Sequence, residues 1–175
     1  MFKIQTHYKI AAVFLFVLTL SLVFSGQASA ASITVNTDTN PSPCTLDEAI
    51  VNINDGADTN SDCVEIGTYG TDDTITIPAG TVLLSANLPQ ITKPATITGA
   101  GMGQTVIDGD GSRQALNVEL TAGNFTLTEL TVTGFDTTGV LIKNAEEVNI
   151  TQVEIDGDNV SASSGTLLAL GVDND

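Results

Sequence analysis

The stretch Phe125-Thr126-Leu127-Thr128-Glu129-Leu130-Thr131-Val132-Thr133-Gly134 recurs, at an offset of 23, as Val148-Asn149-Ile150-Thr151-Gln152-Val153-Glu154-Ile155-Asp156-Gly157. Just upstream, Leu116-Asn117-Val118 recurs at an offset of 24 as Val140-Leu141-Ile142. Each period thus holds three short segments rich in Val, Ile, Leu and Thr. This pattern predicts an all-β chain wound into a parallel β-helix, with three short strands per coil and each strand stacked on its equivalent one turn later.

The repeat extends in both directions from this stretch. Ala95–Gly99 and Thr105–Gly109 have the same strand-then-glycine ending one turn earlier, with residues 100–104 as an inserted loop. Downstream, Thr166–Leu170 begins a further turn, at an offset of 26 from Val140. A β-sandwich of short strands is the alternative. It gives no reason for a register that returns at nearly equal offsets along the chain.

A helix is predicted ahead of the coils, within residues 44–54. Thr45 and Glu48 have the spacing of a capping box, and Asp55-Gly56 ends the apolar pattern. An open coil exposes unpaired strand edges, so a repeat fold needs a terminal cap. The predicted N-terminal capping helix rests on the polar residues Thr45 and Glu48 and on the apolar stripe Leu46, Ala49, Ile50 and Ile53.

Residues 1–30 have the pattern of a secretory signal peptide. Lys3 and Lys9 precede an apolar run from Ile10 to Phe24, and Ala28-Ser29-Ala30 supplies the small-x-small ending that predicts cleavage after Ala30. In an exported chain, the pair Cys44 and Cys63 predicts a disulfide. Such a bond is worth about 3 kcal/mol in the chain-entropy model. Two free buried thiols are the alternative.

The composition of residues 31–175 excludes several function classes. This part has 21 acidic side chains against Lys93, Arg113 and Lys143, a formal charge of −18, and it has no histidine. Without histidine, it cannot build a Ser-His-Asp site, a Cys-His site or a histidine-rich zinc site. Binding to nucleic acid or anionic lipid is disfavoured because contacts to phosphate depend on Lys and Arg.

Cys44-Thr45-Leu46-Asp47-Glu48-Ala49-Ile50 resembles the CSLREA motif of exported bacterial proteins, with Thr in place of Ser and Asp in place of Arg. Residues 69–81 resemble the segment that enters the first coil in that family, and the resemblance covers about residues 33–160. It implies a right-handed parallel β-helix of the pectate-lyase-like kind. It also implies a bacterial protein that is secreted or displayed on the cell surface, and no single activity.

Two pairs of carboxylates are candidates for glycoside chemistry, which needs two such groups about 5 to 9.5 Å apart. These are Asp108 with Asp110 and Asp156 with Asp158, each directly after a strand. Asp-Gly-Asp is also an ordinary turn sequence, because Asp satisfies its own backbone. We therefore assign no catalytic residue.

Calcium is the one cofactor that the pattern suggests. Asp108-Gly109-Asp110-Gly111-Ser112 resembles the start of a calcium loop, and Glu119 stands twelfth from Asp108. Residues 55–62 form a second acidic cluster. A solvated acidic surface that keeps the protein soluble is the simpler explanation of both clusters.

The chain thus divides into a signal peptide (1–30), an N-terminal cap (31–72) and β-helix coils (73–175). No capping segment follows the last strand, so we expect further coils of a longer chain or a capping partner. The predicted function is a secreted or cell-surface β-helix module, acting as a structural or adhesive stalk or as a glycan-binding surface. The alternative is the N-terminal part of a secreted carbohydrate-active enzyme, pectate-lyase-like or a glycoside hydrolase, whose catalytic coils lie downstream.

Overall fold

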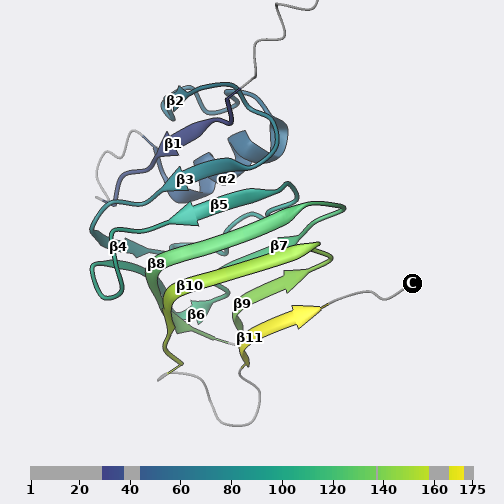
Figure 1. The fold of residues 1–175 in the computed structure, drawn as a ribbon. Helices are drawn as coiled ribbons and strands as arrows, with labels where there is room; N and C mark the ends of the chain where they lie inside the picture. Colours follow the sequence, from purple (N-terminus) through teal and green to yellow (C-terminus); the bar gives the residue numbers. More distant parts are fainter. Residues whose placement is uncertain (1–28, 38–43, 137, 158–165, 172–175) are drawn as a thin grey trace, which may run out of the picture.

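A computed structural model describes residues 29–37, 44–136, 138–157 and 166–171 of the 175-residue chain. Its parallel strands stack into a β-solenoid of about three turns with one short helix near its N-terminal end (Figure 1). The elements are β1 (Ser32–Thr34), α2 (Leu46–Asp55), β2 (Glu65–Ile66), β3 (Asp73–Thr76), β4 (Gly80–Leu83), β5 (Ala95–Thr98), β6 (Thr105–Arg113), β7 (Leu116–Glu119), β8 (Asn124–Phe135), β9 (Thr138–Lys143), β10 (Glu147–Ile155) and β11 (Thr166–Gly171).

The solenoid has three faces. The first face consists of β3, β5 and the first halves of β8 and β10, with β1 as an extra rung at the top. The second face consists of β4, β6 and the second halves of β8 and β10. The third face consists of β7, β9 and β11, with Ile91 bridged to Val118 as the rung before them. Three strands per coil are therefore confirmed.

The repeats at offsets of 23 and 24 correspond to stacked rungs. Val148 lies opposite Phe125 and Ile155 opposite Val132, in parallel register. Val140 lies opposite Leu116. The strand after residue 165 is shifted, because Leu168 rather than Thr166 lies opposite Val140. The predicted offset of 26 was wrong, and the observed offset of 28 matches Thr166 with Thr138, so that residues of the same kind stack.

The corners between faces depend on unusual backbone angles. Glu129 (φ 59°) and Gln152 (φ 55°) turn β8 and β10 from the first face to the second. Gly134 (φ 62°) turns β8 away from the second face. A Cβ at Gly134 would meet Asp108 Oδ1, so glycine is required there both by backbone angle and by space.

Apolar side chains fill the inside of the coil as ladders. The fully buried positions include Ile75, Ile97 and Leu127 on the first face, Ile107 and Val132 on the second, and Leu116 and Val140 on the third. Neighbouring outward residues alternate with them along each strand, as in the BiBi pattern of β5. This alternation explains why short strands with a period of two form a packed core here.

The helix caps the top of this core, as predicted. Leu46, Ala49, Ile50 and Ile53 are buried against the coil, and Gly56 ends the helix in the left-handed conformation. The segment between α2 and β3 contains one short strand, β2, which pairs antiparallel with β1. No helix in the described residues is both long and apolar enough to cross a membrane. Residues 1–28 of the predicted signal peptide lie outside the described residues.

Candidate functional site

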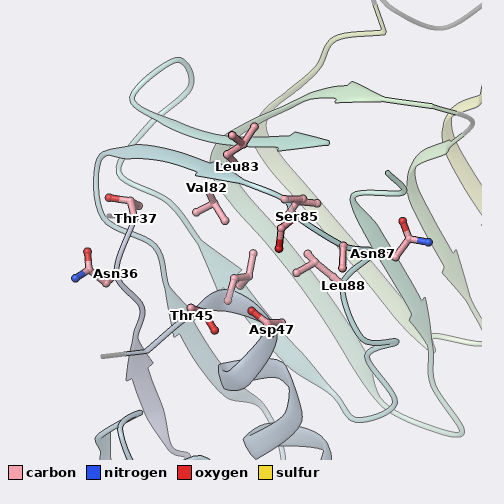
Figure 2. A pocket seen from close by; sticks show the side chains of 12 residues that line it. Asn36, Thr37, Thr45, Asp47, Val82, Leu83, Ser85, Asn87 and Leu88 are labelled. Atoms are coloured by element: carbon pink, nitrogen blue, oxygen red, sulfur yellow. The ribbon is translucent and has the colours of Figure 1, made fainter. Parts of the chain in front are cut away.

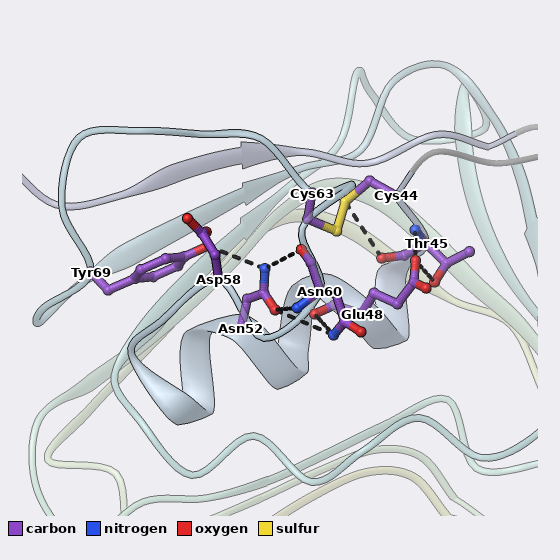
Figure 3. The surroundings of a disulfide bond; sticks show 8 residues. All are labelled: Cys44, Thr45, Glu48, Asn52, Asp58, Asn60, Cys63 and Tyr69. Atoms are coloured by element: carbon purple, nitrogen blue, oxygen red, sulfur yellow. Dashed lines mark hydrogen bonds between the residues drawn. A yellow bond between two sulfur atoms is a disulfide. The ribbon is translucent and has the colours of Figure 1, made fainter.

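The disulfide and the helix start form one compact unit (Figure 3). Cys44 and Cys63 are bonded, with their Cα atoms 4.6 Å apart, and both are buried. Directly after Cys44, the Oε2 atom of Glu48 accepts the backbone N–H of Thr45 at 2.9 Å and the Thr45 hydroxyl at 2.7 Å. The predicted disulfide and capping box are both present. The bond fixes the loop that follows the helix to the residue that precedes it.

A polar network holds this loop against the helix. Asn52, which is fully buried, donates through Nδ2 to the Asn60 carbonyl at 3.0 Å and to the Tyr69 hydroxyl at 3.3 Å. Its Oδ1 accepts the Asn60 backbone N–H at 2.8 Å, and the Tyr69 hydroxyl donates to Asp58 at 2.9 Å. Sequence reasoning missed Asn52. The available signal was a polar residue beside the apolar positions Ala49, Ile50 and Ile53 of a short helix.

The nearest approach to a metal cluster in the described residues is made by Glu48, Asp62 and Cys63, whose ligand atoms lie within 4.8 Å of one another. The sulfur of Cys63 is part of the disulfide and is not a thiolate. One oxygen of Glu48 already accepts two hydrogen bonds at the helix start. Calcium takes about 6 to 8 oxygen ligands, far more than this group supplies. We treat the group as part of the cap.

A groove of about 300 Å³ lies between the cap and the coil (Figure 2). Thr45, Leu46 and Asp47 form one wall, and Val82, Leu83 and Leu88 belong to the opposite side. Its volume is at the lower limit of small-molecule sites. Residues 38–43, which connect the lining residue Thr37 to Cys44, lie outside the described residues. We therefore assign no ligand to this groove.

Asp108 and Asp110 lie in the second part of β6, where the register with β8 is irregular. The Asp108 carboxylate accepts the backbone N–H of Asp110 at 2.9 Å, the contact expected of an ordinary Asp turn. Glu119 lies on the third face, where it accepts Gln90 Nε2 at 2.9 Å and lies 3.9 Å from Lys143 Nζ. The twelve-residue spacing therefore does not bring Glu119 to Asp108. Asp158, the predicted partner of Asp156, lies outside the described residues.

The first face presents an array of uncharged polar side chains in two columns. Each rung contributes one residue to each column, because the pattern Thr-x-Thr recurs in register from strand to strand. Adjacent rungs in such a sheet are about 4.8 Å apart. The array consists of Ser32 and Thr34, Thr74 and Thr76, Thr96 and Thr98, Thr126 and Thr128, and Asn149 and Thr151. The recurring Thr-x-Thr was visible in the sequence, but its alignment into two columns required the register.

No family model matches the chain, and neither the curated proteins nor the solved structures contain a significant match to it.

Proposed function

We propose that this protein is an exported β-helix module of the bacterial cell surface that serves as a structural and adhesive stalk, with the first face as its contact surface for a neutral glycan. The observation that carries the proposal is the array of uncharged side chains on that face. Every position of its two columns, from β1 to β10, is uncharged, in a chain whose predicted exported part has a formal charge of −18.

The chemistry of this face suits a neutral polysaccharide. A hydroxyl group donates one hydrogen bond and accepts two, as do the hydroxyls of a sugar. Evenly spaced rungs repeat the same contact along the axis of the coil, so a polymer can make many weak contacts at once. The acidic remainder of the surface repels anionic polymers and restricts binding to uncharged ones.

The end of the coil supports a role as one part of a longer stalk. The apolar side chains Val148, Ile150, Val153 and Ile155 of β10 are only partly buried. Within the described residues, β10 pairs with β8 on one edge and with no strand on the other. Further coils of a longer chain, or a capping partner, would cover this rung as each coil covers the one before it.

The test compares binding of the exported chain to immobilised neutral polysaccharides before and after removal of hydroxyls. The variant T96V/T98V/T126V keeps the shape and the strand preference of the side chains. We expect its affinity to fall by about tenfold or more, the effect of losing roughly 1.4 kcal/mol or more of hydrogen bonding over three hydroxyls. The control T81V/T133V alters outward positions on the second face and leaves binding unchanged.

Equal binding by the two variants would contradict the proposed surface. The same preparations, incubated with pectin and other acidic glycans, also test the enzyme alternative. Cleavage of any of these polymers would show that the protein is a carbohydrate-active enzyme and would contradict the proposed role as a stalk.

A further inference from the structure

Asp73 is an exception among the inward-facing residues of the coil. It is the first residue of β3 and is 1% exposed. On the next two rungs, the stacked positions are Ala95 and Phe125. The positions that stack with it on the following rungs are apolar. A buried carboxylate is costly unless it is paired and hydrogen-bonded. The partners of Asp73 therefore indicate why the residue is there.

Those partners are backbone N–H groups at the start of the fold. The N–H of Ala31 donates to Asp73 Oδ1 at 2.8 Å, and the N–H of Gly70 contacts both carboxylate oxygens at 3.2 Å. Within the described residues, no Lys or Arg side chain lies within ion-pair distance of Asp73. The negative charge of this carboxylate thus has no side-chain cation to balance it.

Ala31 is firmly docked at this point. It is 1% exposed, its carbonyl accepts the N–H of Thr74 at 2.8 Å, and Ser32 pairs with both Thr74 and Ile66. In contrast, Ser29 and Ala30 are exposed. The Ser29 carbonyl still accepts the N–H of Thr68 at 3.0 Å, so contact with the cap begins before Ala31. Burial begins at Ala31, directly after the Ala30–Ala31 bond where the sequence predicts signal-peptide cleavage.

We propose that Asp73 is the binding site for the new α-ammonium group of Ala31, so that removal of the signal peptide creates a buried ion pair that locks the first rung. The proposal rests on the predicted cleavage site and is independent of the glycan-binding surface. Hydrolysis of the Ala30–Ala31 amide by water, catalysed by a signal peptidase, leaves a carboxylate on Ala30 and an amine on Ala31. That amine takes up a proton near neutral pH, since free α-amines have a pKa of about 7.7–8.0.

The lock sets an order of events. A peptidase needs the residues on both sides of the scissile bond in accessible, extended form, whereas the folded cap buries Ala31. Cleavage therefore precedes docking of β1, and the charge that balances Asp73 appears only in the processed chain. A chain that keeps its leader makes the same amide contact without the positive charge, so its first rung is held less tightly.

The first measurement is the N-terminal sequence of the full-length chain after export with its own leader, which we expect to begin Ala31-Ser32-Ile33. The second is a double-mutant cycle in thermal unfolding. One change is Asp73→Asn. The other is a glycine inserted after Ala30, which moves the charge outward by one residue and keeps the Ala31 N–H. We expect the insertion to lower the melting temperature by roughly 3–8 °C. Asp73→Asn should lower the melting temperature clearly more in the processed wild type than in the chain with the inserted glycine.

A third measurement avoids dependence on the folding of Asp73→Asn. Under native conditions, an amine-reactive reagent should label Lys93 and Lys143 of the processed chain much faster than the Ala31 amine. In the inserted chain, the displaced amine should react at the rate of an exposed group. Any of three results would overturn the proposal. The exported chain could begin at another residue, Asp73→Asn could lower the melting temperature equally in both backgrounds, or the Ala31 amine could be labelled fast.

Discussion

Tyr69 links the disulfide loop to the helix and is the residue with the clearest electrostatic signature in the described part of the chain. Partial burial, followed by the hydrogen bond to Asp58, raises its pKa from 10.0 to about 12. The chain has two tyrosines, and the other, Tyr8, belongs to the predicted signal peptide. The exported chain thus has a single tyrosine that reports on the cap alone.

We predict that the tyrosinate absorbance of the exported chain rises with a midpoint near pH 12, against about 10 after denaturation. Between these values the folded state holds a proton that the unfolded state has released, so the free energy of unfolding falls as the pH rises. Asp58→Asn should lower the midpoint. Asp55→Asn, whose carboxylate accepts the Thr59 hydroxyl instead, is the matched control and should leave it unchanged. A native midpoint near pH 10 would contradict the described Tyr69 environment.

The residue scale also explains why the strongest carboxylate motif has a structural role. The Asp108 side chain accepts the N–H of Asp110, and its Oδ1 would clash with a Cβ on Gly134. Both features belong to the corner between the second and third faces. The Asp-Gly-Asp sequence is therefore fully accounted for by the turn that it forms.

At the scale of elements, β11 is the strand whose register the repeat did not predict. It pairs with β9 so that Thr166 lies opposite Thr138, and Leu168 opposite Val140. The offset between β9 and β11 is 28 residues, whereas the offset between β7 and β9 on the same face is 24. Because the turns differ in length, the offset of an earlier turn does not predict which residues of β9 and β11 stack.

We predict that cysteines at the paired positions form a disulfide, because directly opposite Cα atoms are about 4.8 Å apart and lie inside the range that a disulfide spans. The variant T138C/T166C should therefore cross-link in air, as seen by mass mapping of unreduced peptides. The matched control V140C/T166C has the register of 26. In the observed register its Cα atoms are diagonal neighbours about 7–8 Å apart and should remain thiols. Cross-linking only in the control would show that the offset of 26 is correct and that the register with Thr166 opposite Thr138 is wrong.

At the scale of the whole molecule, charge and stacking act against each other. Apolar ladders hold the rungs together. The excess of acidic side chains, a formal charge of −18 on the predicted exported chain, destabilises the folded state by mutual repulsion. Within the described residues, Lys143 with Glu119 is the one ion pair. The acidic surface is therefore balanced by salt in solution more than by its own cations.

We predict that the melting temperature of the exported chain rises as NaCl increases from low concentration to about 0.5 M, because the Debye length falls below about 10 Å above 0.1 M salt. Calcium and magnesium at equal millimolar concentrations should raise it equally. A larger rise with calcium would reveal a specific site, and loss of that excess in D108N/D110N would locate it at the Asp108 turn.

The sequence by itself determined the elements whose causes are local. The helix over Leu46–Asp55 follows from Thr45, Glu48 and Gly56, and the strands follow from alternation around Ile97 or Leu127. The stacking of Phe125 with Val148 was also predictable, because the two segments repeat one sequence pattern at an offset of 23.

Only the tertiary structure decided which distant residues meet. It aligned the Thr-x-Thr pairs into one uncharged face, placed Glu119 beside Lys143 rather than Asp108, and brought Ala31 to Asp73 across 42 residues. The physical reason is that a coil brings residues together through the lengths of its turns, and the turns of this chain differ. A local pattern specifies a strand, whereas its neighbours depend on every corner and loop in between.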